Sequence, residues 1–115
     1  MTRLWNPRTG AVLAQRVERA RTPWARLRGL LGRDALPGGE ALCIEPCTSI
    51  HTFFMRFPID ALFLRRDGLV VRAVASLRPF RATRFYPSAA MAVELPAGTL
   101  LRTGTREGDV LAFSE

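Results

Sequence analysis

The sequence predicts a mainly β protein, a small sandwich-like or barrel-like domain of short strands with one short α-helix at about residues 22–33. Short apolar runs recur along the chain, and clusters of Asn, Asp, Gly and Pro separate them. Only one stretch spaces its apolar side chains as a helix does. About seven to nine short strands with one helix are typical of a β-sandwich or barrel.

Length and composition indicate one domain over residues 1–115 without a linker. The chain has 115 residues, of which 48% are hydrophobic and 23% charged, as in an ordinary globular domain. A chain of this size can bury a core without a metal or a disulfide. No stretch approaches the roughly 18 apolar residues of a transmembrane helix. The N-terminus lacks the apolar core of a secretory signal, so we expect a cytoplasmic protein.

The first half of the chain contains the predicted helix between strands. Leu4 and Trp5 begin a strand before the turn at 6–10, and residues 11–20 form the next strand. The helix begins at Thr22-Pro23, because Thr is a favoured N-cap and Pro is tolerated at the first helical position. The Pro-Gly-rich segment 34–39 ends it.

The second half reads as strands joined by turns and one long loop. Asp67-Gly68 between two apolar runs predicts a hairpin. Segment 76–90 is rich in proline, arginine and aromatic residues, which favours a loop. The expected strands cover residues 41–45, 49–57, 59–65, 69–75, 91–95, 99–102 and 110–113.

The run from Ser49 to Phe57 is predicted to be a central strand. Its alternate residues are apolar on both faces, so neighbouring layers should cover it on both sides. The polar side chains of His51, Thr52 and Arg56 would then need hydrogen-bond partners or a wet cavity. His51 is either a hydrogen-bonded histidine at the core margin or a residue that binds a ligand or transfers a proton.

Two carboxylates lie among apolar neighbours. Asp60 shares strand parity with Leu62 and Leu64, and Arg56 is its nearest candidate partner in the sequence. Asp60 is either a structural carboxylate that holds loop amides or a tuned acid at the rim of a pocket. Glu94 points away from the face of its apolar strand neighbours, and we expect a positive partner for it there.

Cys43, Cys47 and His51 recur at intervals of four, which suggests a metal site because zinc binds thiolate and imidazole. In a straight strand, however, neighbours four residues apart lie about 13 Å from each other, too far for one ion. We therefore predict no metal and no cofactor. A thiolate–imidazolium pair of Cys47 and His51 would need a bend at Pro46, and Ser49 lacks a nucleophile elbow.

The chain is strongly basic. All 17 basic residues are arginine, and the formal net charge is +7. Arg78, Arg81 and Arg84 are interleaved with aromatic residues in segment 78–87, which makes them candidates for binding an anion or a nucleic acid. The alternative is a loop whose aromatic side chains pack on the sheets and whose arginines are solvated. The partners suggested by the sequence are a polyanion or a small ligand.

The motifs resemble those of a known family, the bacterial and archaeal domain of unknown function 192. The similarity spans the chain, and the motifs that carry it are Arg26-x-x-Gly29-Leu30-Leu31-x-Arg33, the run from Ser49 to Asp60 with Leu62-Phe63-Leu64, Asp67-Gly68, Val93-Glu94-Leu95-Pro96-Ala97-Gly98 and Gly108-Asp109. The resemblance implies a small mainly β domain with a minor helix and no agreed activity. It also implies that many relatives are exported behind a leader. The resemblance further implies relatives that replace the histidine motif, which would argue against His51 as a universal catalyst.

Three functions follow from these residues. The first is a non-enzymatic binding or accessory protein with a pocket formed by His51, Thr52, Met55, Arg56, Asp60 and Glu94. The second is a small acid/base hydrolase that uses His51 with Asp60 or Glu94; catalysis is the less favoured reading. The third is an anion-binding or nucleic-acid-binding module that uses Arg78, Arg81 and Arg84 with the helix arginines. The second requires His51 to contact a carboxylate in an open cleft.

Overall fold

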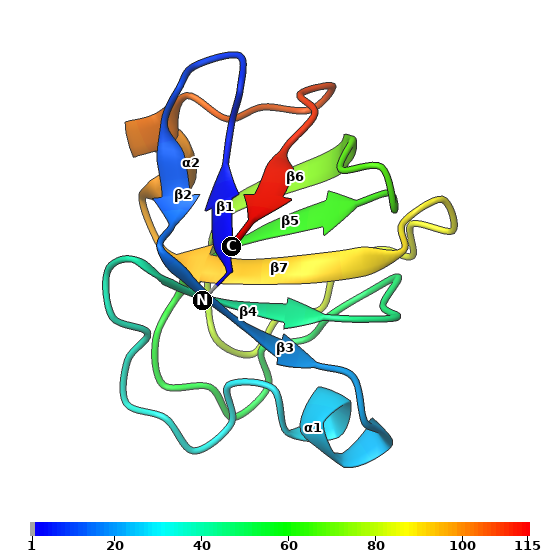
Figure 1. Cartoon of the computed structure of the whole chain (residues 1–115). Coiled ribbons are helices and arrows are strands. Elements are labelled where there is room, and N and C mark those ends of the chain that lie inside the picture. The colour runs from blue at the N-terminus through cyan, green and yellow to red at the C-terminus, as the bar shows by residue number, and fades with distance from the viewer. Residues whose placement is uncertain (1) are drawn as a thin grey trace.

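The computed structural model describes residues 2–115, whose strands form two open sheets (Figure 1). A sheet of three strands lies across a sheet of five, and neither closes into a barrel. The sandwich-like, mainly β class is confirmed. In chain order the elements are β1 (Arg3–Trp5), β2 (Val12–Ala14), β3 (Arg16–Ala20), α1 (Pro23–Arg28), β4 (Glu40–Ile44), β5 (Ile59–Leu64), β6 (Val70–Leu77), β7 (Met91–Pro96), α2 (Thr99–Thr103) and β8 (Ala112–Ser114).

The smaller sheet has the strand order β2-β1-β8 and the larger sheet β3-β4-β7-β5-β6. All strand pairs are antiparallel except β3 with β4. The predicted strand over residues 11–20 divides at Gln15, where the chain passes from one sheet to the other. The backbone N–H groups of Gln15 and Arg16 both donate to the carbonyl of Gly39, which ties this crossing to the start of β4.

Two apolar cores lie on opposite faces of the larger sheet. The first fills the space between the two sheets, with side chains such as Leu4 and Leu13 from one sheet and Leu62 and Val93 from the other. The second contains Leu42, Phe63 and Ala92 and lies on the outer face. Strand β7 is central, and both of its faces are buried from Met91 to Leu95.

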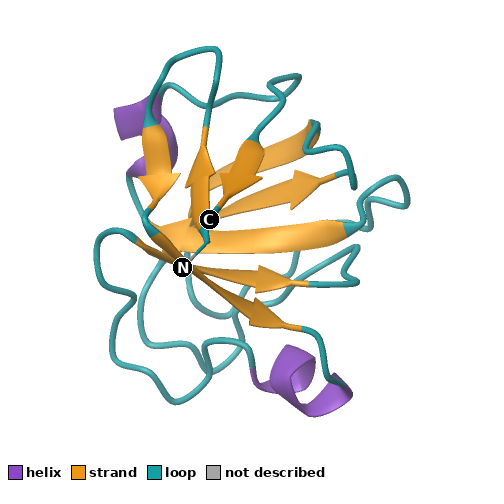
Figure 2. Cartoon of the chain, in the orientation of Figure 1, coloured by secondary structure: helices purple, strands orange, loops and turns teal. Residues whose placement is uncertain are grey.

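The outer face of the larger sheet is covered mainly by loops (Figure 2). Helix α1 is shorter than the predicted 22–33. Its start is as expected, because the Thr22 side chain accepts a hydrogen bond from the Ala25 N–H at 3.1 Å. It ends at Gly29, whose φ of 50° is outside the helical region. Turns continue the chain to Arg33, and none of the residues of α1 is fully buried.

Two predicted strands are wrong. Residues 49–57 form no regular strand; only His51 bridges Ala82, and the Met55 N–H donates to the Thr52 carbonyl in a turn that places Phe54 at a φ of 65°. Residues 49–57 are therefore apolar without being part of the sheet. Residues 99–103 form α2 instead of a strand, because the carboxylate of Asp60 accepts a hydrogen bond from the Leu100 N–H in the first turn.

The predicted hairpin at Asp67-Gly68 is confirmed. It joins β5 to β6, and the Arg65 N–H donates to the Leu69 carbonyl at 2.9 Å. Gly68 has a φ of 91°, and a Cβ there would lie 2.2 Å from the carbonyl oxygen of Leu111. No other residue fits this position. Among residues 2–115, no helix is both long enough and apolar enough to cross a membrane.

Candidate binding pocket

A pocket of about 370 Å³ opens on the outer face of the larger sheet, between α1 and the irregular segment that follows β4. This volume lies in the range typical of small-molecule sites. Most of its wall is aliphatic, and the polar groups are few. The lining residues are Pro23, Arg26, Leu27, Arg28, Gly29, Leu30, Leu31, Ile44, Pro46, Cys47, Ser49, Ile50, His51, Met55 and Glu94.

Glu94 provides the carboxyl group of this pocket. It lies at the middle of the larger sheet, because its neighbours across β7 are Leu42 of β4 and Ala61 of β5. Its side chain is only 3% exposed. Its Oε1 atom is buried and has no hydrogen-bond partner among residues 2–115. A buried polar atom without a partner is unfavourable and rare, so its place in a pocket wall requires an explanation.

Burial raises the pKa of Glu94 from 4.5 to about 7. The charge of Arg33 acts in the opposite direction, but that side chain is engaged elsewhere, 2.7 Å from Glu18. The positive partner that the sequence suggested for Glu94 is thus not in contact with it among the described residues. Near neutral pH the carboxyl group is close to half protonated, so it can donate or accept a hydrogen bond.

Cys47 lies in the same wall with its thiol protonated. The Sγ–H group donates to the Ser49 carbonyl at 3.0 Å. Burial raises the pKa of Cys47, and this outweighs the opposing effect of the hydrogen bond with the Ser49 backbone. The nearby charge of Glu94 raises the pKa further, and that of Arg26 lowers it. A thiol with a raised pKa is a poor nucleophile, so the pocket does not activate Cys47.

His51 is exposed and lines the mouth of the pocket. Its Nδ1 accepts a hydrogen bond from the Phe53 N–H at 3.3 Å, and its ring stacks on that of Phe53 with 5.4 Å between centroids. The neutral imidazole therefore carries its proton on Nε2. No hydrogen bond joins His51 to a carboxylate among residues 2–115. His51 thus opens on a cleft but lacks an orienting acid.

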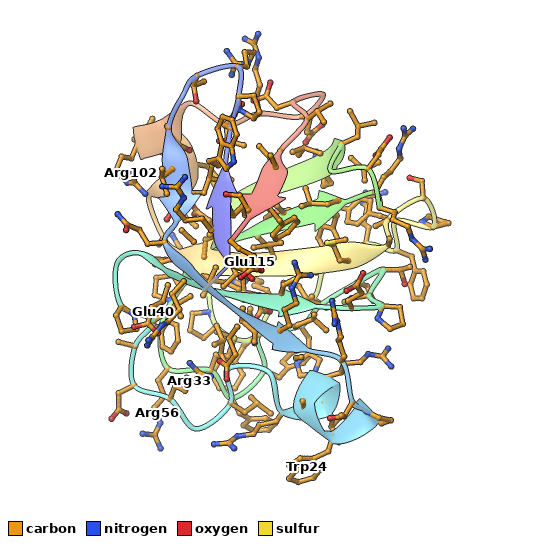
Figure 3. All side chains as sticks on the ribbon, viewed as in Figure 1. Trp24, Arg33, Glu40, Arg56, Arg102 and Glu115 are labelled. Atoms are coloured by element: carbon orange, nitrogen blue, oxygen red, sulfur yellow. The ribbon has the colours of Figure 1, made fainter. Side chains whose placement is uncertain are left out.

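Three of the predicted pocket residues lie elsewhere. Thr52 is fully buried, and its hydroxyl donates to the Arg78 carbonyl at 2.5 Å and accepts from the Arg81 N–H at 3.0 Å. It therefore fastens the loop 78–87. Arg56 forms an exposed ion pair with Asp34 at 2.5 Å and points outward at the edge of the molecule (Figure 3).

Asp60 lies on the opposite face of the sheet from Glu94. Its Oδ1 accepts from the Ser76 N–H and its Oδ2 from the Leu100 N–H, each at 2.9 Å. Arg56, expected as its partner, binds Asp34 instead. Of the two alternatives for Asp60, the carboxylate that holds loop amides agrees with these contacts. The predicted residues that do line the pocket are His51, Met55 and Glu94.

The two cysteines lie on different faces of the sheet. Cys43 is buried in the first core with its sulfur 3.6 Å from that of Met91, and burial raises its pKa to about 11. Cys47 packs against the second core. Among residues 2–115, no group of three or more His, Cys, Asp or Glu side chains is placed to hold a metal ion.

No sequence signal predicts that α1 lines a pocket. Arg26, Leu27 and Arg28 line it, whereas the sequence assigned the helix arginines only to a possible anion-binding module. Trp24 and Leu27 are 72% and 67% exposed, and Trp24 points away from the molecule (Figure 3). Apolar spacing identifies a helix but does not say which face a neighbour covers.

Comparisons with known proteins agree with this fold. The family model DUF192, described as "Uncharacterized ACR", matches residues 5–113. No functionally curated protein matches the chain. A protein of unknown function from Novosphingobium aromaticivorans DSM 12444 has a similar structure, with a TM-score of 0.82, 21% identity and coverage of 96% of this chain and 82% of that one. A "putative transcription regulator" from Sinorhizobium meliloti 1021 has a TM-score of 0.79, 25% identity and coverage of 97% and 91%.

Proposed function

The chain belongs to the domain of unknown function 192 family, and we propose that this member is a non-enzymatic binding protein for a small ligand. The ligand has a compact apolar body and a primary ammonium group, which binds Glu94. One observation carries this proposal: the buried Oε1 atom of Glu94 has no partner and belongs to the wall of a pocket of ligand size.

The chemistry of the pocket supports this ligand class. Leu30, Ile50 and Met55 provide apolar surface for the body of the ligand. An ammonium donor at Oε1 would satisfy the orphaned atom and favour the ionised carboxylate, through a charge-assisted hydrogen bond. An anionic ligand at the same place would meet the negative charge of the ionised Glu94 carboxylate, which is unfavourable in a buried site. Arg26 and Arg28 also line the pocket, but both side chains are exposed on α1 and can remain solvated.

An acid/base hydrolase that uses His51 receives less support. The ring of His51 contacts Phe53 rather than a carboxylate, and the Cys47 thiol is protonated. A catalytic base normally has a partner that orients it and a nucleophile within hydrogen-bond reach. The single domain over residues 1–115, the cytoplasmic location and the lack of a cofactor stay predictions.

The proposal is tested with three probes of one shape and different charge: benzylamine, benzyl alcohol and benzoate. Titrations followed by two-dimensional ¹H–¹⁵N NMR at about pH 8, where the Glu94 carboxyl is mostly ionised, report on the amides of Leu30, Ile50 and Met55. We expect saturable shifts with benzylamine, weaker binding of benzyl alcohol and none of benzoate.

Two variants complete the test. Glu94→Gln keeps the size of the side chain and removes its charge. It should weaken the binding of benzylamine by roughly tenfold or more and change the affinity for benzyl alcohol little. Glu40→Gln removes a carboxylate of the same sheet outside the pocket and should leave both affinities unchanged. Equal binding of benzylamine to the wild type and to Glu94→Gln would refute the proposed ligand class.

A further inference from the structure

We propose that a second surface, which adjoins the Glu94 pocket but shares none of its lining residues, binds single-stranded nucleic acid. This aromatic–arginine surface consists of Phe53, Phe54 and Phe80 with Arg78, Arg81 and Arg84. It goes beyond the proposed function, because it requires neither the pocket nor its ligand. All six side chains are exposed.

The surface is built on a short two-stranded ribbon. Residues 50–52 run antiparallel to residues 80–83, with backbone hydrogen bonds between Thr52 and Arg81 and between Thr83 and Ile50. Ile50 and Thr52 are buried beneath the ribbon. His51, Phe53, Phe80, Ala82 and Arg84 are exposed on it. A ribbon fixed from below therefore presents its aromatic and basic side chains outward.

The backbone holds two of these rings in an unfavourable conformation. Phe54 and Phe80 have φ values of 65° and 62°, in the left-handed region that side chains with a Cβ seldom adopt. They are nevertheless 76% and 57% exposed, and their rings meet edge to face at 5.8 Å. Burial of these rings in the core does not explain this arrangement. Strained residues that stay exposed are characteristic of binding sites.

The charge around the rings fits a polyanion. The two segments that build the surface, residues 46–59 and 68–93, contain no Asp or Glu. No ion pair engages Arg78, Arg81 or Arg84 among residues 2–115. An open hollow beside the ribbon is lined by Arg84 and Arg72, the latter paired with Glu107 at 3.2 Å. Guanidinium groups at such a surface can bind phosphates.

Rings and charges alternate along the loop, and this order favours nucleic acid over a membrane. Phe80 lies between Arg78 and Arg81, and Phe85 follows Arg84. A single strand likewise alternates bases, which stack on rings, with phosphates, which pair with arginines. A membrane-binding face instead gathers many apolar side chains together and places the charges around them. Here the ring contacts join only Phe54 to Phe80, while Phe53 stacks on His51.

The test is fluorescence anisotropy of fluorescein-labelled oligouridylate and oligothymidylate of about 20 nucleotides, titrated with the full chain at several KCl concentrations. If three arginines pair with phosphates, the logarithm of the association constant should fall against the logarithm of salt with a slope of about −2. Binding to a duplex of equal length should be weaker, because its bases are not free to stack.

Matched variants separate the surface from the general charge of the protein. Phe54→Ala and Phe80→Ala should each weaken binding about fivefold or more. Arg81→Gln should reduce the slope by about 0.7, whereas Arg3→Gln, an exposed arginine on β1 of the other sheet, should not. Glu94→Gln should leave oligonucleotide binding unchanged, which keeps this test independent of the pocket.

Circular dichroism and thermal unfolding establish that each variant is folded before its affinity is compared. Three results would overturn the proposal. One is no binding of either oligonucleotide at low salt, and another is equal weakening by Arg81→Gln and Arg3→Gln with no effect of the Phe variants. The third is sedimentation with vesicles of phosphatidylcholine and phosphatidylglycerol without oligonucleotide binding.

Discussion

Replacing Glu94 with Gln should remove a pH dependence of stability that the buried carboxyl group creates. In the unfolded chain this carboxyl loses its proton near pH 4.5, whereas in the folded protein its pKa is raised to about 7. Between these values the folded state binds more protons than the unfolded state, so the free energy of unfolding falls as pH rises. The interval from 4.5 to about 7 corresponds to roughly 3 kcal/mol, at about 1.4 kcal/mol per pH unit.

Urea unfolding of the wild type and the variant at several values from about pH 4.5 to 8.5 measures this contribution. Ionisation of Glu94 in the folded protein lowers the free energy of unfolding; this loss is absent below pH 4.5 and complete above about pH 7. Between these pH values the free energy of unfolding of Glu94→Gln should therefore rise by roughly 3 kcal/mol relative to that of the wild type. Glu40→Gln should follow the wild type. The reasoning would be refuted if the free energies of unfolding of Glu94→Gln and the wild type differed by the same amount at about pH 4.5 and about pH 8.5.

Three further predictions concern Thr52, Asp60 and Phe54. Thr52→Val should lower the free energy of unfolding by about 1–3 kcal/mol in urea unfolding, because it leaves the Arg81 N–H without its hydroxyl acceptor; a neutral effect would contradict this. Asp60→Ala should cost roughly 3 kcal/mol in urea unfolding, because it removes the acceptor of both the Ser76 and the Leu100 N–H groups. The folded variant should still bind benzylamine, and loss of that binding would place Asp60 in the pocket. Phe54→Gly should raise stability by about 1 kcal/mol while weakening oligonucleotide binding, and a loss of stability would instead assign Phe54 to the core.

Local signals predicted much of the fold. The Asp67-Gly68 hairpin formed as expected because Gly68 meets both a positive φ and the close approach of Leu111. Thr22 capped α1 because an N-cap depends only on residues within one turn. The central strand β7 was recognisable from its apolar residues alone, and the position of Glu94 on its other face followed from alternation.

The misjudged segments depend on contacts that are distant in sequence. Apolar residues at 49–57 suggested a buried strand, but Thr52 bonds to the loop near Arg81, and the turn that follows exposes Phe54. Residues 99–103 became helical because Asp60, 40 positions earlier than Leu100, accepts its N–H. Neither partner can be read from the local pattern.

The candidate site was predicted only in part, because its contacts too join residues that are distant in sequence. His51, Met55 and Glu94 line one pocket. Arg56 and Asp60 are close to His51 in sequence, but Arg56 pairs with Asp34 and Asp60 accepts a hydrogen bond from the Ser76 N–H. Sequence proximity grouped these residues, and the fold separates them. The contribution of α1 to the wall depends on how the helix lies over the sheet, which its own spacing does not determine.

The most direct test of the ligand site is a ¹³C NMR titration of the Glu94 side-chain carboxyl group with and without saturating benzylamine. Without the amine, its pKa should be about 7. With the amine bound, its pKa should fall, because an adjacent ammonium group favours the carboxylate. The same pKa in both titrations would contradict the claim that Glu94 is the ligand-binding group of this pocket.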